Sequence, residues 1–247
     1  VKDGKSIVVV TGEGSVIRVV SLVALRVRRA DGHVFVQVGK REGSRMKAAC
    51  QLPGFKQDRG ELVGEAIQRL FDTKLQPLAN QVTITSTVRE NSEQPSKEYG
   101  VHTRYLKSVC TAEVKPDASI EAPLCSGRRA ASCSEDTLAS GEVDPADAEI
   151  MSILQRTEVL VIGSAEAASR SLYSWLSPDM FTRLSGGGKE HVLNWWLANL
   201  TLPEEEEGKD EDARGTPRME HDVEEELFGC GLPLGQVNPC TRSILQG

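Results

Sequence analysis

Three carboxylates lie at helical spacing between residues 61 and 72 of this 247-residue chain, and their chemistry bears on what the chain could catalyse. Hydrolysis of a diphosphate needs a divalent cation, held by several oxygen ligands, that neutralises the phosphates and activates water. The available acids are Glu61, Glu65 and Asp72, but Glu65 and Asp72 would lie roughly 10 Å apart along a helix. We therefore assign no metal site and no catalytic residue, with Glu61 and Glu65 as the nearest catalytic candidates.

A glycine-bracketed loop and an amphipathic helix must position these acids. Gly54 and Gly60 free the backbone where the chain turns sharply. From Glu61 onward the apolar residues recur with the period of a helix of about four turns, which predicts one buried stripe. The stripe consists of Val63, Ile67, Leu70 and Phe71. An ordinary core helix after a turn is one interpretation of this stretch.

A family resemblance is the other interpretation. Residues 51–75 resemble the Nudix box, Gx5Ex7REUxEExGU with U a bulky apolar residue, which Leu-Pro-Gly usually precedes. Leu52-Pro53-Gly54 matches this lead-in, Gly60-Glu61 matches the end of the loop, and Arg69 falls where the pattern has its arginine. The resemblance implies a Nudix fold, in which a mixed sheet lies between helices.

The departures from the box concern its chemistry. A Nudix hydrolase uses three glutamates for its metal and its base, and here those positions hold Leu70, Thr73 and Lys74. None of these side chains is a carboxylate, and Lys74 places an ammonium where a cation should bind. The resemblance therefore implies the fold of the family without its activity.

Apolar segments on both sides of the box predict the rest of the fold. Alternating or continuous apolar runs predict strands over residues 6–10, 16–28, 34–38, from 82 onward, 99–114, 158–162 and from 171 onward. Helices are expected over residues 144–155 and 190–200. A short helix that ends at residue 184 is expected after the strand that begins at residue 171. We expect 16–28 and 34–38 to form a hairpin, and 39–47 and 91–98 to be loops.

We expect one domain with two appendages. Residues 1–202 should form the Nudix-like α/β/α sandwich, with a mobile insertion at about 115–144 where large apolar residues are few. Residues 203–247 should form an acidic, largely disordered tail. Within it, residues 204–226 hold twelve acids against Lys209, Arg214 and Arg218, and residues 224–232 resemble a short acidic and apolar docking motif.

Basic residues beside the loop are the candidate ligand-binding set. Lys40, Arg41, Arg45 and Lys47 precede the loop, either as a solvated loop of their own or as a patch that faces phosphate. The full set adds Gly54, Lys56 and Arg69. His102 and His191 are single histidines, and we assign neither a catalytic role.

Three functions from different classes remain open. The first is a catalytically degenerate Nudix-like module that senses a nucleotide-type ligand or binds a protein partner, with no cofactor. The second is an active Nudix-type pyrophosphohydrolase of nucleoside diphosphate derivatives, which would use magnesium and displaced acids among Glu61, Glu65, Asp72 and Glu90. The third is a scaffold subunit or domain of a larger assembly.

Composition indicates which classes of partner and which cellular compartment to expect. No apolar run reaches the length of a membrane span, and the near-neutral charge outside the tail is not the basic footprint of a nucleic-acid binder. Six cysteines without a CxxC pair predict free thiols in a reducing compartment. We expect an intracellular protein of the cytoplasm or nucleus, or of an organelle if a targeting segment precedes Val1.

Overall fold

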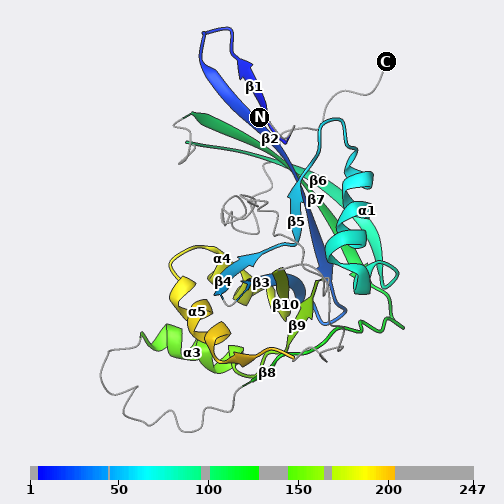
Figure 1. Ribbon diagram of the computed structural model, residues 1–247, viewed down its shortest axis with the longest axis vertical. Coiled ribbons are helices and arrows are strands. Elements are labelled where there is room, and N and C mark those ends of the chain that lie inside the picture. The colour runs from blue at the N-terminus through cyan, green and yellow to red at the C-terminus, as the bar shows by residue number, and fades with distance from the viewer. Residues whose placement is uncertain (1–4, 44, 96–100, 128–143, 164–168, 204–247) are drawn as a thin grey trace, which may run out of the picture.

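A mixed sheet of nine strands forms the centre of the chain (Figure 1). The computed structural model describes residues 5–43, 45–95, 101–127, 144–163 and 169–203. The strands of the sheet are β1 (Ile7–Val10), β2 (Val16–Arg28), β3 (Val34–Glu42), β4 (Arg45–Gln51), β5 (Gly54–Lys56), β6 (Val82–Pro95), β7 (His102–Val114), β9 (Val159–Ile162) and β10 (Ser169–Leu176). Their order is β6-β7-β2-β3-β10-β9, with β1 and β5 paired to β2 and β4 paired to β3.

Helices cover both faces of this sheet. The helices are α1 (Val63–Lys74), the 3-10 turn η1 (Gln76–Leu78), α3 (Pro145–Leu154), α4 (Pro178–Ser185) and α5 (Glu190–Ala198). One core cluster joins α1 to the sheet, and a second joins α3, α4 and α5 to it. Figure 1 shows α1 on one side of the strands and the other three helices together on the opposite side. The predicted α/β/α sandwich with a mixed sheet is therefore confirmed.

Strand β2 divides the two cores. Its neighbours are β7, which runs parallel to it from Ile17 to Arg28, and the antiparallel strands β1 and β5. Successive side chains of a strand point to opposite faces. Val23, Leu25 and Val27 accordingly pack with α1, whereas Ala24 packs in the cluster of the other helices.

Side-chain caps fix where three helices begin. The Asp144 carboxylate accepts a hydrogen bond from the Ala146 amide at 3.0 Å, and Ser177 Oγ accepts one from the Met180 amide at 3.2 Å. Each cap is followed by a proline at the first helical position, where no amide hydrogen is needed. At α1 the Glu65 carboxylate accepts from the Leu62 amide at 2.9 Å, so the helix begins at Val63 and not at Glu61.

Two segments expected as loops are strands. Residues 39–47 continue β3 to Glu42, turn at Gly43 with φ of 57°, and return as β4. Residues 91–95 belong to β6, where Pro95 pairs with His102. Both segments are rich in polar residues because they project beyond the helices or lie at an edge of the sheet, where the backbone pairs but the side chains meet water.

The hairpin expected between residues 16–28 and 34–38 forms only next to its turn. Only Arg28 and Val34 pair, since β3 then diverges and β5 takes the adjacent edge of β2. Near the expected insertion, the Cys125 amide donates to the Val159 carbonyl at 2.8 Å, and the short strand β8 (Ser126–Gly127) pairs with β11 (Leu200–Thr201). Residues 128–143 and the tail from 204 lie outside the described residues.

No helix in the described ranges is long and apolar enough to cross a membrane.

The contact of Gly54 with β2 gives a prediction about the fold. A Cβ atom at Gly54 would lie 2.2 Å from the Val23 carbonyl oxygen, so Gly54→Ala must push the two strands apart. We expect a loss of about 2–4 kcal/mol in the free energy of unfolding, measured by urea titration. The control is Gly64→Ala on α1, where the added Cβ meets no atom within 4 Å. Helix propensity predicts a gain of about 0.5–1 kcal/mol there, and equal effects of the two changes would contradict the steric argument.

Candidate functional site

The loop before α1 is bound to β2 through its backbone. Strand β5 pairs with β2 at three positions, among them Phe55 with Val23 and Gly54 with Ala24. The pairing continues on either side, because the Leu25 amide donates to the Pro53 carbonyl at 2.8 Å and Gln57 bonds to the Ser21 carbonyl at 2.9 Å. The Leu-Pro-Gly lead-in therefore lies flat against the central strand, which explains the need for a glycine at Gly54.

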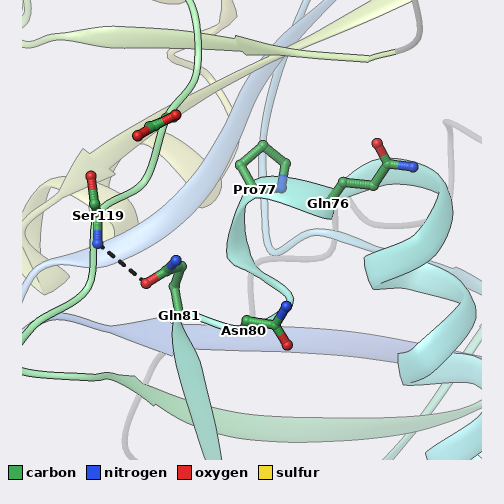
Figure 2. Close-up of a pocket in the computed structure, with 6 residues that line it drawn as sticks. Gln76, Pro77, Asn80, Gln81 and Ser119 are labelled. Atoms are coloured by element: carbon green, nitrogen blue, oxygen red, sulfur yellow. Dashed lines mark hydrogen bonds between the residues drawn. The ribbon is translucent and has the colours of Figure 1, made fainter.

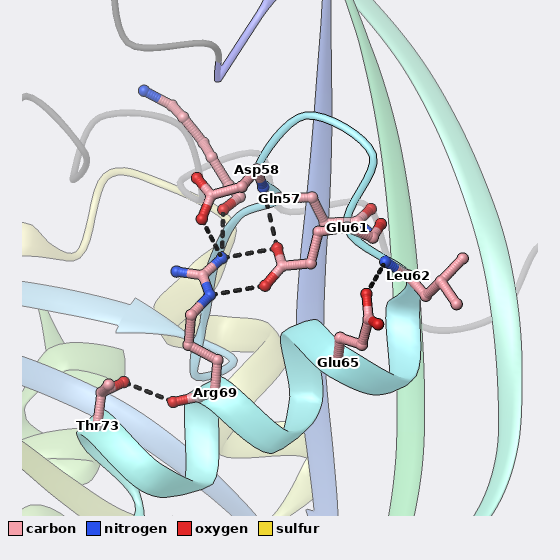
Figure 3. Close-up of polar contacts among 8 residues, drawn as sticks. Gln57, Asp58, Glu61, Leu62, Glu65, Arg69 and Thr73 are labelled. Carbon is pink, nitrogen blue, oxygen red and sulfur yellow. Dashed lines mark hydrogen bonds and ion pairs between the residues drawn. The ribbon is translucent and has the colours of Figure 1, made fainter.

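A bidentate ion pair closes this loop onto the helix (Figure 3). Arg69 Nε donates to Glu61 Oε1 at 2.7 Å, and Arg69 Nη2 donates to Glu61 Oε2 at 2.7 Å. Two parallel hydrogen bonds between a guanidinium and a carboxylate are among the strongest polar contacts in proteins. The Glu61 side chain is 11% exposed and that of Arg69 is 35% exposed, so the pair is partly shielded from water.

Further contacts hold each partner of this pair in place. The Asp58 amide donates to Glu61 Oε2 at 2.9 Å, and Arg69 Nη2 donates to the Lys56 carbonyl at 3.3 Å. The Arg69 guanidinium also lies 3.9 Å from the centre of the Phe55 ring. The hydrogen bonds from Arg69 are the main cause of the lowered pKa of Glu61. An ionised carboxylate with both oxygens engaged is a poor general base.

The other acids proposed for catalysis also have local partners. Glu65 accepts from the Leu62 amide at the start of α1, and Asp72 accepts from the Gln68 side chain at 2.9 Å. Glu90 on β6 lies 3.9 Å from the Lys107 ammonium. Within the described residues, no three acids, histidines or cysteines come together as ligands for a metal ion.

The three positions at which the box pattern has glutamates have three different environments. Leu70 is 0% exposed and belongs to the core between α1 and the sheet. Thr73 is exposed, and its hydroxyl donates to the Arg69 carbonyl at 2.7 Å. The Lys74 ammonium lies 5.6 Å from the centre of the Phe55 ring. These positions supply an apolar core residue, a helix-surface hydroxyl and a cation, and none supplies an anionic oxygen.

The predicted ligand-binding residues fall into two groups. Gly54, Lys56 and Arg69 come together at the loop. The four other cations lie on the β3–β4 hairpin: Lys40, Arg41, Arg45 and Lys47.

Cross-strand pairing in this hairpin places like charges side by side. Lys40 lies directly opposite Lys47, and Arg41 lies opposite Arg170 of β10. Such pairs are unfavourable unless an anion lies nearby. Glu42 meets part of this need, because its carboxylate lies 3.0 Å from the Lys40 ammonium.

A buried carboxylate that the sequence analysis overlooked joins two helices. Asp147 in the first turn of α3 accepts from the Lys189 ammonium at 2.5 Å and from His191 Nε2 at 2.8 Å. These hydrogen bonds, that from Lys189 first, lower the pKa of Asp147. Lys189 and His191 lie more than 40 residues from Asp147 in sequence, so local spacing could not predict this contact. The only sequence signal for it was an acid at an otherwise apolar helical position. It ties α3 to α5 and contains no nucleophile.

A separate hollow lies near η1, beyond the C-terminal end of α1 (Figure 2). Its volume is about 500 Å³, and Gln81 Oε1 accepts from the Ser119 amide at 3.2 Å within it. The walls are amides, a hydroxyl, a proline and one carboxylate: Gln76, Pro77, Asn80, Gln81, Ser119 and Glu121. These lining residues include no cation, so the hollow does not suit a phosphate.

The Glu61 pair predicts how stability changes with pH. Because its pKa is lowered in the folded state, ionised Glu61 stabilises the fold above the ordinary value of 4.5, and the contribution is lost as pH falls through the folded pKa. Glu61→Gln should therefore cost about 1–3 kcal/mol at pH 7, and the difference from the native chain should shrink towards pH 3. Urea titrations at several pH values measure this. The control is Glu13→Gln at an exposed turn; a pH-independent cost for Glu61→Gln would refute the proposed role.

The burial of Leu70 predicts the result of restoring the glutamates. Leu70→Glu would bury an unpaired carboxylate and should lower the free energy of unfolding by several kcal/mol. Thr73→Glu on the exposed face is the matched control and should change stability by less than about 0.5 kcal/mol. Melting temperatures with and without manganese measure both effects. A stable Leu70→Glu variant whose melting temperature rises with manganese would show instead that this helix face is a vestigial metal site.

Comparison with known proteins gives likeness in structure and none in sequence. No protein-family model and no curated protein sequence matches the chain. Solved structures that it resembles include the MutT protein from Methanosarcina mazei Go1, with 18% identity, a TM-score of 0.28 and coverage of 42% of this chain and 70% of that one. A Nudix hydrolase from Nitrosomonas europaea matches with 16% identity, a TM-score of 0.27 and coverage of 41% and 64%. The Nudix hydrolase RenU from M. smegmatis matches with 21% identity, a TM-score of 0.28 and coverage of 47% and 73%. Because these TM-scores are low, we base the function on the contacts within this chain.

Proposed function

We propose that this chain is a catalytically degenerate Nudix-like domain that binds an anionic, nucleotide-type ligand or a protein partner without hydrolysing it. The observation that carries the proposal is the bidentate engagement of Glu61 by Arg69 at 2.7 Å for both bonds. The loop keeps its shape through this pair. The one acid that the box retains is thereby committed to holding the loop.

The charge around the loop favours an anion over a metal ion. Arg69 and Lys74 both lie against the Phe55 ring, at 3.9 and 5.6 Å from its centre. Two unit charges a few ångströms apart interact by several kcal/mol at the effective dielectric of a protein surface. Glu61 and Asp58 balance the charge of Arg69, so Lys74 is the cation that would repel a divalent metal ion and attract a phosphate. Binding through side-chain cations would need no magnesium.

The cations at the loop also suit the phosphates of a nucleotide-type ligand. Lys and Arg supply the charge-assisted hydrogen bonds that phosphate oxygens accept. The candidate contact at the loop is therefore Lys74, with the hairpin cations on the same sheet as further candidates.

Nucleotide binding and turnover can be measured in one experiment. We expect ATP, ADP-ribose or a dinucleoside polyphosphate to raise the melting temperature equally with magnesium and with EDTA, because a ligand bound only by the folded state stabilises it. No phosphate or nucleoside monophosphate should be released. Lys74→Gln should weaken the shift, while Lys115→Gln, a surface lysine that bonds to the Asn80 carbonyl, should not.

The opposite outcomes identify the competing functions. Turnover that disappears with EDTA and with Glu61→Gln would show a pyrophosphohydrolase with displaced acids. A melting temperature that no anionic ligand changes would leave a protein-interaction or scaffold role.

A further inference from the structure

Strand β1 (Ile7–Val10) is an edge of the sheet that lies beyond the helices. It pairs with residues 16–19 of β2, and no other described strand pairs with it. Figure 1 shows β1 and the adjoining part of β2 projecting past all the helices. Its side chains are apolar and open to solvent: Ile7, Val8, Val9 and Val10 are 52%, 51%, 43% and 66% exposed. Because successive side chains point to opposite faces, β1 exposes apolar surface on both faces of the sheet.

The hydrogen bonds of the β1–β2 turn show which backbone groups of β1 point outward. The Thr11 amide donates to the Ser15 carbonyl at 2.8 Å, so these two residues form a hydrogen-bonded pair of the antiparallel ladder. Hydrogen-bonded and non-hydrogen-bonded pairs alternate along such a ladder. The odd-numbered residues of β1 therefore bond to β2. The amides and carbonyls of Val8 and Val10 point to the outer edge.

The other outer strands of the described sheet carry features that prevent pairing with a further strand. Strand β6 has a register shift after Ile84, a run of charged and polar residues, and Pro95 at its end. Strand β9 is 1–7% exposed and bonds to residues 123–125. Strand β4 carries the charged residues Arg45 and Lys47. Charges, prolines, bulges and covering segments are the means by which proteins block sheet edges, and β1 has none of them.

We infer that β1 is a self-association edge, to which a second copy of this chain adds its own β1 antiparallel across a two-fold axis. A two-fold interface joins the same patch of both copies, so the patch must be complementary to itself. Pairing through the outward groups of Val8 and Val10 meets this condition, because Val8 of each copy then lies opposite Val10 of the other. Each of these hydrogen-bonded pairs exchanges two backbone bonds. The two Val9 residues face each other on the axis as a non-hydrogen-bonded pair.

The side chains fit this register. No residue of β1 is charged, so no like charges lie opposite each other. Lys5 precedes the strand and Glu13 follows it, and antiparallel pairing brings these oppositely charged ends side by side. A shift of two residues in either direction would pair Val8 or Val10 with itself and would place the other opposite a residue outside the strand.

The size of the interface predicts a weak and reversible dimer. A strand of four residues from each copy buries much less than the roughly 1,200–2,000 Å² of a stable protein complex. We expect half of the chains to be paired at a concentration of about 10 µM to 1 mM. The inference does not use the proposed ligand site, and it is tested without a nucleotide.

Charged residues at position 9 test the two-fold arrangement. Val9→Lys and Val9→Glu each place like charges opposite each other on the axis, so each should raise the dissociation constant of the dimer at least about tenfold. An equal mixture of the two variants should restore pairing, because opposite charges then face each other. Analytical ultracentrifugation of the full chain, over concentrations of about 10 µM to 1 mM, measures these effects.

Val88 on β6 provides the matched control. It is a valine that is 57% exposed on another outer strand. Val88→Lys and Val88→Glu should leave the dissociation constant unchanged, and mixing them should have no effect. Far-UV circular dichroism checks that every variant is folded.

Hydrogen exchange of single amides tests which backbone groups meet the second copy. Raising the protein concentration over the same range should slow the exchange of the Val8 and Val10 amides, because they bond to the second copy. The Val9 amide bonds to β2 within each copy, so its exchange rate should change far less.

The inference is overturned by any of three results. A chain that stays monomeric at the highest concentration does not pair through β1. A mixture of the Val9 variants that pairs no better than either variant alone shows that Val9 does not face itself on an axis. Loss of pairing in the Val88 variants assigns the interface to β6.

Discussion

The bidentate pair between Arg69 and Glu61 is the contact on which the loop and the first helix depend. It joins the end of the loop to the second turn of α1, while Arg69 also bonds to the Lys56 carbonyl on β5. The loop, the helix and strand β5 are thus held by one guanidinium. The same pair engages both oxygens of Glu61, so this carboxylate holds the loop in place.

The positions at which the box pattern has glutamates differ on the two sides of α1. Leu70 on the inward face belongs to the core between the helix and the sheet. Lys74 on the outward edge places its ammonium 5.6 Å from the centre of the Phe55 ring. One side of the helix therefore contributes to the core and the other carries a cation, and neither of these two residues supplies an anionic oxygen.

Periodicity predicted most elements because it depends on local sequence. The stripe of Ile67, Leu70 and Phe71 predicted α1, the apolar run predicted β2 over Val16–Arg28, and Asp144-Pro145 predicted the start of α3. Periodicity failed at residues 39–47 and 91–95, which are polar and yet pair as strands. Residues 91–95 pair with β7, the next strand along the chain, whereas residues 39–42 pair both with β4 and with the distant strand β10. Periodicity missed these pairings because a polar edge strand carries no apolar alternation.

The sequence by itself determined that α1 would form, that residues 70, 73 and 74 carry no carboxylate, and that cations precede the loop. Residue types and local spacing suffice for these conclusions. Only the tertiary structure decided that Glu61 is engaged at both oxygens, that Asp147 meets Lys189 and His191, and that Lys56 and Lys107 flank Leu22. These contacts join residues on different strands and helices, and the register of the sheet and the packing of helices on it set which side chains meet.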